Sequence, residues 1–473
     1  MKKVLLVNTN IEKFPYPIPP LGLCLLATSL ESFYEVRVYD GVFDEGKALP
    51  GLTREFRPDY IGFSIRNIDD VVADRHIFYL DRIISDFISP VRKITLVPVI
   101  LGGSGFSIFP TEILSLTGAD YGIKGEGEVS LPALLQFLDE GKEPAGIPGL
   151  YKKIDSGTVA DFSPPAKGCT VTHSVMERWI DFSTYLSRGV YSIQTKRGCV
   201  HHCIYCTYPC IEGKSLRMRD PVDIVAEMEN VTERLDDVVI EFVDSTFNEP
   251  PGFAETLCRE IIRRGLKIRM RTMGINPGNT SAELFELMLK AGFTQIDVTP
   301  DSASPSVLRR LGKGFTLKEV RQTADLIRLS GIPSMWFFLF GGPGENVKTF
   351  YETLDFIDSY IPANDLVYMN AGLRVYPGTP LHAIAVKEGM ICIDDPVLFP
   401  PLFYYSNEIG KEKLDQLIKE ASITRINCIP ALETQPSAEL LMEAARIRKE
   451  QNLKEPMFRT LLRLRREGAA EQR

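Results

Sequence analysis

Short apolar runs alternate with helix-like segments along much of this 473-residue chain, and this alternation restricts the fold more than any other feature. Parallel strands cannot be joined by tight turns and need a crossover, which is usually a helix. The alternation therefore predicts an α/β architecture with parallel sheets. In the first 140 residues, the expected strands are Val4–Val7, Val36–Tyr39, Tyr60–Ser64 and Val97–Leu101, and the expected helices are Leu21–Leu30 and Val71–Phe87.

These elements predict a Rossmann-like, doubly wound domain over residues 1–140, and a second array predicts another domain. Six further strand–helix units predict a partial (β/α)6 barrel over residues 186–390. Its expected strands are Tyr191–Thr195, Val238–Val243, Ile268–Thr272, Thr294–Thr299, Met335–Phe340 and Leu366–Val375. Residues 141–185, which are rich in proline, are expected to form a linker, and residues 391–473 a mostly helical C-terminal region.

Small and polar residues follow the predicted strands of the first domain. In parallel sheets, ligands bind beyond the carboxyl ends of the strands. The candidate binding residues at these ends are Asn8, Ser64, Arg66, Gly102, Gly103, Ser104, Gly125 and Glu126. Tight turns would explain each glycine singly, but their joint placement at one edge favours close approach of a bulky ligand to the backbone.

Charge and hydropathy exclude several classes of protein. The 54 basic and 62 acidic residues give a net charge of −8, whereas nucleic-acid binding needs a basic surface. The first apolar run is too short for a signal peptide, and no run of 18 apolar residues predicts a membrane span. A cytoplasmic protein is expected. The basic stretch Arg459–Arg473 is expected to be a packed, solvated end-helix rather than a contact with a membrane surface or a partner.

Nine cysteines are present, and three of them are closely spaced at Cys199, Cys203 and Cys206. In a reducing compartment, such a group indicates metal or redox chemistry before disulfides. Three thiolates do not complete a tetrahedral zinc site, and no second pair lies at zinc-ribbon spacing. A four-iron cluster held by three cysteines instead leaves one iron open to an exogenous ligand. The alternative is a structural metal clip.

With Tyr205, these cysteines match the CxxxCx(aromatic)C signature, so the chain resembles the radical S-adenosylmethionine (SAM) superfamily. The resemblance implies a [4Fe–4S] cluster whose open iron binds SAM, a 5′-deoxyadenosyl radical, and an electron donor of the flavodoxin or ferredoxin type. Cys210 lies outside the motif and is expected to be an incidental buried thiol or, alternatively, a substrate-side residue. His201 and His202 are expected to shape the loop rather than bind metal.

Four further segments of the predicted barrel resemble the same superfamily. The resemblance places Asp244 near SAM, and Asp301 and Ser302 where relatives carry a Glu–Ser pair that contacts SAM. Arg310 is expected either to reach the SAM carboxylate or to be a surface charge. The turn at Gly341 and Gly342 resembles the glycine turn beneath the adenine.

The order Pro19–Gly22, Gly102–Gly103 and Gly125–Glu128 ahead of such a barrel resembles the cobalamin-binding subgroup. The resemblance implies cobalamin as a third cofactor. None of the five histidines lies in the DxHxxG motif that ligates cobalt, so cobalamin is expected to bind base-off without a histidine ligand. Arg66 is then expected to lie below cobalt as a non-coordinating cation, or else to form a salt bridge with Asp69 or Asp70.

The subgroup implies methylation of an unactivated carbon of a small-molecule substrate, through methylcobalamin and a 5′-deoxyadenosyl radical. The alternatives are a radical rearrangement or ring closure without methyl transfer and, more remotely, a non-catalytic corrinoid or iron–sulfur module. No basic RNA-binding appendage is evident, so no nucleic-acid substrate is expected. A secondary metabolite or lipid-like substrate is expected, and the aromatic residues that would line its pocket, or else belong to the core, are Trp336, Tyr376, Phe403, Tyr404 and Tyr405.

Overall fold

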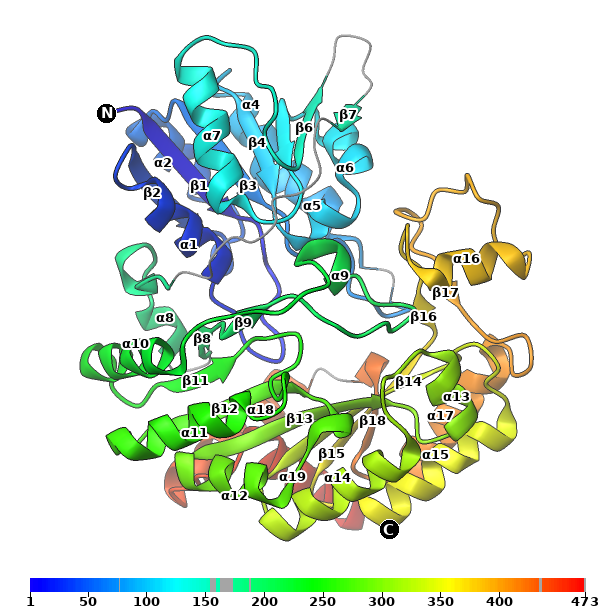
Figure 1. Cartoon of the computed structure of the whole chain (residues 1–473). Helices are drawn as coiled ribbons and strands as arrows, with labels where there is room; N and C mark the ends of the chain where they lie inside the picture. The colour runs from blue at the N-terminus through cyan, green and yellow to red at the C-terminus, as the bar shows by residue number, and fades with distance from the viewer. Residues whose placement is uncertain (76, 154–158, 162–172, 187–188, 434–435, 472–473) are drawn as a thin grey trace. The chain divides into compact units, whose positions relative to one another are not determined.

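The computed structural model describes residues 1–75, 77–153, 159–161, 173–186, 189–433 and 436–471 (Figure 1). The chain divides into two compact units. The first contains Met1–Val71, His76–Val200 and Thr207–Arg219, and the second contains Val72–Arg75, His201–Cys206 and Asp220–Arg473.

The sheet of the first unit has the strand order β2-β1-β3-β4-β5-β6-β7. Its first five strands are parallel, which agrees with the predicted parallel sheet, although only the first four were among the expected strands. β6 and β7 are antiparallel additions from the stretch expected to be a linker. The strands are β1 (Lys3–Asn8), β2 (Glu35–Asp40), β3 (Tyr60–Ser64), β4 (Val99–Gly102), β5 (Tyr121–Ile123), β6 (Leu150–Lys153) and β7 (Val159–Asp161).

Helices connect these strands (Figure 1). They are α1 (Leu21–Leu30), α2 (Leu49–Phe56), α3 (Tyr79–Arg82), a π-helix (Ile83–Ile88), α4 (Ser89–Arg92), α5 (Ser104–Ile108), α6 (Pro110–Thr117) and α7 (Gly127–Asp139). The helix predicted over Val71–Phe87 begins later, at Tyr79. Val71 has a φ of +55°, and an isolated antiparallel bridge joins Asp69 to Phe78, so the helix does not extend back to Val71.

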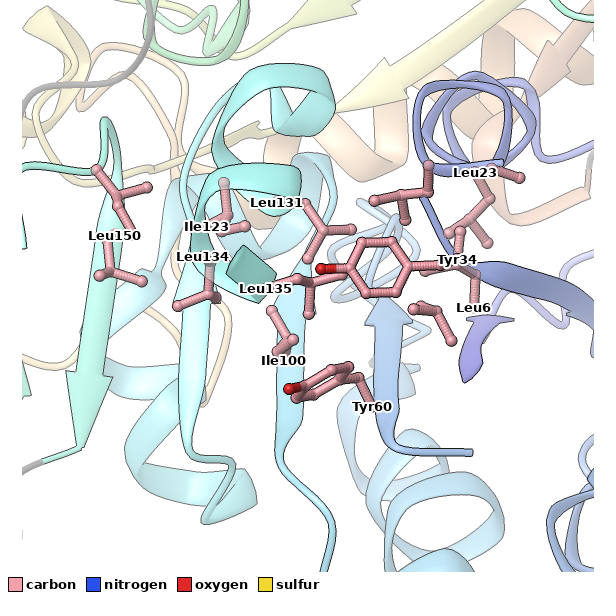
Figure 2. Close-up of a cluster of buried hydrophobic side chains, with 14 residues drawn as sticks. Leu6, Leu23, Tyr34, Tyr60, Ile100, Ile123, Leu131, Leu134, Leu135 and Leu150 are labelled. Carbon is pink, nitrogen blue, oxygen red and sulfur yellow. The ribbon is translucent and has the colours of Figure 1, made fainter. Parts of the chain in front are cut away.

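The core of the first unit lies where α1 and α7 cover the sheet. Figure 2 shows Leu131, Leu134 and Leu135 of α7 in the same apolar cluster as Ile100. Asp139, the last residue of α7, accepts hydrogen bonds from the hydroxyls of Tyr34 and Tyr60 at 2.6 and 2.7 Å. The end of α7 is therefore fixed by polar as well as apolar contacts.

The first unit also contains the chain on either side of the cysteine motif. Its elements are a 3-10 turn (Met176–Arg178), α8 (Ser183–Leu186), β8 (Tyr191–Ile193), β9 (Lys196–Arg197), α9 (Tyr208–Ile211) and β10 (Arg217–Met218). β9 and β10 pair antiparallel, which joins the segment ahead of the motif to the segment behind it.

In the second unit, neighbouring parallel strands follow the order β18-β15-β14-β13-β12-β11. They are β11 (Val239–Phe242), β12 (Arg269–Ile275), β13 (Phe293–Asp301), β14 (Ser334–Phe340), β15 (Leu366–Ala371) and β18 (Cys428–Pro430). β18 was not expected, because three residues carry no readable periodicity. A short antiparallel pair, β16 (Leu373–Arg374) and β17 (Phe403–Tyr404), lies beyond β15.

The helices of the second unit separate these strands, as predicted for strand–helix units. They are α10 (Pro221–Arg234), α11 (Phe253–Arg264), α12 (Ala282–Ala291), α13 (Pro305–Arg310), α14 (Leu317–Ser330), α15 (Val347–Tyr360), α16 (Pro380–Lys387), α17 (Lys411–Thr424), α18 (Ala438–Glu450) and α19 (Met457–Glu471), with 3-10 turns at Pro277–Asn279 and Ala431–Glu433.

The end of the chain is a packed helix. Phe458 and Leu462 of α19 are buried against Leu366 of β15 and Ile429 of β18, at one edge of the sheet. None of the described helices combines the length and the hydropathy that are needed to cross a bilayer.

Candidate cofactor sites

A cavity of about 250 Å³ opens in the first unit at the carboxyl ends of its parallel strands. Five residues predicted for this site line it, namely Ser64, Gly102, Gly103, Gly125 and Glu126. Apolar side chains of α1 and the sheet, among them Leu23 and Leu101, form most of the remaining wall. An apolar cavity with a glycine-rich edge suits a large, flat ligand.

Gly103 shows why this edge needs glycine. Its φ is +97°, and a Cβ at this position would lie 2.6 Å from the carbonyl oxygen of Ile65. Gly125 has a φ of +84° and donates its backbone N–H to the hydroxyl of Ser107 at 2.9 Å. The backbone is therefore exposed to the cavity without intervening side chains.

Asn8, Arg66 and Ser104 do not line the cavity. The amide of Asn8 is buried and donates to Asp40 at 2.8 Å, while the Ser104 hydroxyl donates to the carbonyl of Arg66 at 3.1 Å. The Arg66 side chain is exposed and forms no ion pair with any residue that the structure describes. The salt bridge considered as the alternative role of Arg66 is therefore not formed here.

The cysteine motif lies in a loop between β9 and α9. Cys199 is buried and its backbone N–H donates to Gly213 at 3.2 Å, while Cys203 and Cys206 are partly exposed. No disulfide bond joins any of the described cysteines. Within the described ranges, no three His, Cys, Asp or Glu side chains already form a group that could hold a metal ion.

The donor chemistry nevertheless fits an iron–sulfur cluster. Thiolates are soft ligands of the kind that such clusters use. A buried cation favours the thiolate form of cysteine. Lys313 lies close enough to Cys203 and Cys206 for their charges to act on it. Burial alone would lower the pKa of Lys313, but the charges of Asp301 and Cys203 raise it.

Tyr205, the aromatic residue of the motif, belongs to a buried polar group with Asp301 and Lys313. The Tyr205 hydroxyl donates to the Asp301 carboxylate, and Lys313 Nζ donates to the same carboxylate at 2.7 Å. Lys313 Nζ also donates to the carbonyl of Thr299 at 3.2 Å. Burial and the Asp301 charge raise the pKa of Tyr205 well above its usual value, so it stays a neutral donor.

Asp301 therefore faces Lys313 and Tyr205, and it does so from a φ of +65°, a conformation rare for a residue other than glycine. Ser302 is buried and bonds within the unit, accepting the backbone N–H of Ser304 at 3.1 Å. Sequence reasoning missed Lys313 as a site residue, because no local pattern indicates its pairing with Asp301.

Asp244 and Arg310 have different environments. Asp244 is buried at the end of β11, whereas Arg310 is exposed at the end of α13. The Arg310 guanidinium lies against the glycine turn that follows β14: a Cβ at Gly344 would be 2.5 Å from Arg310 Cζ. Arg310 thus lies near the turn that the sequence analysis also assigned to SAM.

Glu345 shapes this turn from inside the protein. Its carboxylate accepts the backbone N–H groups of Gly341 at 2.5 Å and Gly342 at 3.3 Å. Its other oxygen is buried without a hydrogen-bond partner among the described residues. Burial raises the pKa of Glu345 to about 7, despite these two donors. Glu345 was not singled out as a functional residue from the sequence.

We expect Glu345→Gln to change how stability depends on pH. The folded-state pKa lies above the ordinary value of 4.5, so the folded protein holds this proton more tightly. The resulting stabilisation is complete below about pH 4.5 and is lost as the pH rises through about 7. The glutamine variant should lack this loss, which is roughly 3 kcal/mol. Thermal unfolding at pH 5 and pH 8 measures the effect, with exposed Glu233→Gln as control; equal pH dependence in all three proteins would contradict it.

His201 lies inside the cysteine motif, where it was expected to shape the loop, and Cys210 lies just beyond the motif. His201 Nε2 lies 2.7 Å from the amide nitrogen of Asn276 and 3.5 Å from the Glu249 carboxylate. Cys210 is exposed, so the expectation that it is buried was wrong. It lies in the single turn of α9, which is too short to shield it.

Comparison with known proteins gives two family matches. Residues 7–135 match the model of the B12 binding domain, and residues 193–357 match that of the radical SAM superfamily. The chain is 29% identical over 420 residues to the tryptophan 2-C-methyltransferase of Streptomyces laurentii, covering 74% of this chain and 69% of that protein. It is 26% identical over 210 residues to the hopanoid C-2 methylase of Rhodopseudomonas palustris, covering 43% and 39% of the two chains.

Two solved structures share the fold. The radical SAM methyltransferase TsrM of Kitasatospora setae, with cobalamin and a [4Fe–4S] cluster bound, superposes with a TM-score of 0.82 at 24% identity over 99% of this chain and 100% of that one. The cobalamin-dependent radical SAM enzyme OxsB gives 0.73 at 17% identity, over 100% of this chain and 71% of that one.

These matches confirm the predicted order of an α/β cobalamin domain ahead of a radical SAM barrel. They also confirm the predicted cofactors, which are a [4Fe–4S] cluster, SAM and cobalamin. The chain therefore carries a B12-binding domain, over residues 7–135, ahead of a radical SAM domain, over residues 193–357.

Proposed function

We propose that this protein is a cobalamin-dependent radical SAM methyltransferase that methylates an unactivated carbon of a small molecule. The observation that carries the proposal is the glycine-edged cavity of the first unit, in a chain that also bears the Cys199, Cys203 and Cys206 motif. Methyltransferases of this class are among its relatives, including the enzyme from Streptomyces laurentii.

The proposed role of the protein is to hold and orient three cofactors. Together the cluster and SAM supply one-electron cleavage of SAM, and cobalamin supplies methyl transfer. The three cysteines would hold the cluster, and Gly102, Gly103 and Gly125 would let cobalamin lie close to the backbone. All three glycines line the cavity and have no side chain to fill it, which supports this role.

For SAM, we propose contacts from the second unit. Asp244, Arg310 and the backbone around Gly341–Gly342 would meet SAM, while Ser302 would support the loop through its bond to Ser304. Asp301 would act through Tyr205, which it holds by a hydrogen bond. A flavodoxin or ferredoxin would deliver the electron, and the reduced thiols that this chemistry needs suit the cytoplasm.

The substrate class is proposed from a charged row across three neighbouring strands. The register pairs Glu241 of β11 with Arg271 of β12, and Arg271 with Gln295 of β13. Arg271 Nε lies 2.8 Å from the Glu241 carboxylate, and Gln295 donates to Asp297 at 3.0 Å. Burial raises the pKa of Asp297 to about 7. Such a row can recognise a substrate with a carboxylate and an amine.

Aromatic side chains on the adjacent strands support a substrate with an aromatic body. Phe337 of β14 and Tyr368 of β15 are stacked with centroids 5.0 Å apart and are only partly buried. Trp336 and Tyr404, by contrast, are fully buried core residues. A substrate with charged groups and an aromatic body, of the tryptophan kind, is therefore proposed in preference to a lipid.

Anaerobic assays with SAM and a reductant test both proposals. L-tryptophan carries a carboxylate and an amine, tryptamine carries the amine alone and indole carries neither, so turnover should fall in that order. Methylation through a radical gives S-adenosylhomocysteine and 5′-deoxyadenosine together. S-adenosylhomocysteine alone would contradict the radical step, 5′-deoxyadenosine alone would indicate a rearrangement, and neither product would indicate a binding module. Equal turnover of indole and L-tryptophan would contradict the charged substrate class.

We expect Arg66→Ala to change the coordination and reduction of bound cobalamin. In the proposed site, Arg66 would hold a positive charge close to bound cobalamin, since it follows Ser64 of the cavity wall. That charge would disfavour a water ligand, so its removal should make reduction of the cofactor harder. Electron paramagnetic resonance of the Co(II) form and redox titration measure the two effects. Arg66→Lys should retain the behaviour of the native protein, as should the exposed Arg54→Ala. Unchanged spectra and potential in Arg66→Ala would remove Arg66 from the site.

A further inference from the structure

Four charged side chains form one ion-pair network inside the first unit. Arg197 donates to Glu126 at 3.1 Å and to Glu128 at 2.6 Å. Arg217 binds the same Glu126 carboxylate with two nitrogens, one of them at 2.9 Å. The two carboxylates and the two guanidinium groups balance in charge.

The network is buried, so its charged groups must keep their hydrogen-bonded partners. The side chains of Arg197 and Glu126 are 6% and 7% exposed. Burial would raise the pKa of Glu126, but Arg217 and Arg197 outweigh it and lower the pKa, so the group stays ionised. Buried charges are stable only while their partners remain in place. A movement of the two glutamates therefore changes the position that is most stable for the two arginines, and the reverse also holds.

One side of the network is the loop Gly125–Glu128, which borders the cavity proposed to hold cobalamin. Glu126 and Glu128 flank Gly127 directly after Gly125, and the backbone here turns into α7. Both glutamates and Arg197 also line the cavity of the first unit. A ligand that fills this cavity restricts the loop that holds the two carboxylates.

The other side is the chain that presents Cys199. Arg197 lies two residues ahead of Cys199, and its Nε donates to Gln194 at 2.9 Å. Gln194 in turn donates to Glu212 at 3.1 Å, and Glu212 accepts the backbone N–H of Gly198 at 3.1 Å. Gly198 has a φ of +93°, and a Cβ there would lie 2.1 Å from the carbonyl of Ser215. The backbone before Cys199 is thus held in one conformation.

We propose that this network couples the two cofactor sites, so that cobalamin and the iron–sulfur cluster bind cooperatively. Glu126 is its central positioning residue, because it joins both arginines. Cobalamin in the cavity would fix Glu126 and Glu128, these would fix Arg197, and the chain that carries Cys199 would need less ordering when the cluster assembles. Coupling between two binding sites is reciprocal, so the cluster should strengthen cobalamin binding by the same factor.

The test is a comparison of hydroxocobalamin affinity in the cluster-free and the cluster-reconstituted full chain, by anaerobic equilibrium dialysis. In the native protein, affinity should rise with the cluster by roughly tenfold, within the usual range for coupled sites. In Glu126→Gln, which keeps the shape and removes the charge, the ratio of the two affinities should fall towards one. The matched control is Glu112→Gln, an exposed glutamate of the same unit, which should keep the native ratio.

Two results would overturn the proposal: a ratio of one in the native protein, or an equal loss of affinity in both cluster states of Glu126→Gln. The second result would assign Glu126 to the cavity alone. If Glu126→Gln fails to fold by circular dichroism, Glu128→Gln removes a single contact and replaces it in the test. Iron retention against a chelator, with and without hydroxocobalamin, gives the reciprocal reading. Cobalamin binding itself tests family membership, so the two failures are distinguishable.

Discussion

Cys206→Ala is expected to abolish cluster assembly and with it all turnover, a loss of about three orders of magnitude or more. A four-iron cluster that keeps one iron open for SAM has only three protein ligands, so none is dispensable. Iron content, the absorbance of the cluster in the visible range and electron paramagnetic resonance after reduction measure assembly. Product formation with SAM measures turnover.

Cys210→Ala is the matched control, since Cys210 lies four residues beyond Cys206 and is exposed. It should retain full iron content and turnover. Normal cluster assembly in Cys206→Ala would show that the motif does not ligate iron. A loss of turnover in Cys210→Ala with an intact cluster would instead support the substrate-side role that was considered for this thiol.

Lys313→Met is expected to lower the free energy of unfolding of the second unit by about 3–5 kcal/mol. The substitution leaves the buried Asp301 carboxylate without its cation, while Asp301 and Lys313 are 5% and 7% exposed. Trp336 is buried in this unit, so its fluorescence reports the transition in urea. A Trp179→Phe background removes the signal of the first unit.

The double variant Lys313→Met/Asp301→Asn separates charge from packing. It removes both charges together, so its loss should be smaller than that of Lys313→Met alone. Lys318→Met, at an exposed position of α14, is the control and should change stability by less than about 0.5 kcal/mol. Equal losses in the single and double variants would mean that the unpaired Asp301 carboxylate is not what destabilises Lys313→Met.

The elements that sequence predicted well are those whose pattern is local. Leu21–Leu30 and Tyr60–Ser64 have the predicted bounds, because each is a continuous apolar segment with clear ends. β6, β7 and β18 were missed for the opposite reason, since strands of three or four residues carry no measurable period. They form by adding to a sheet edge that exists only in the folded chain.

The candidate sites divide in the same way. Glycines at strand ends and cysteines at fixed spacing can be recognised from the sequence alone. Gly102, Gly103 and Gly125 do line the cavity. The ion pairs could not be predicted from the sequence, because Glu126 and Arg197 lie 71 residues apart and only the fold brings them together. Glu126 was therefore assigned to a ligand, although its carboxylate faces two arginines.

The pairing of Glu126 with Arg197 and Arg217 has a consequence for how such proteins can be recombined. A chimera that exchanges residues 1–140 with those of a relative would separate the glutamates from arginines with which they are matched. Gln194–Met218 would have to be inherited together with the cobalamin domain to keep the network whole. The segment that must be exchanged as one piece therefore ends beyond the cysteine motif rather than at the proline-rich stretch. We expect chimeras with this boundary to retain both cofactors.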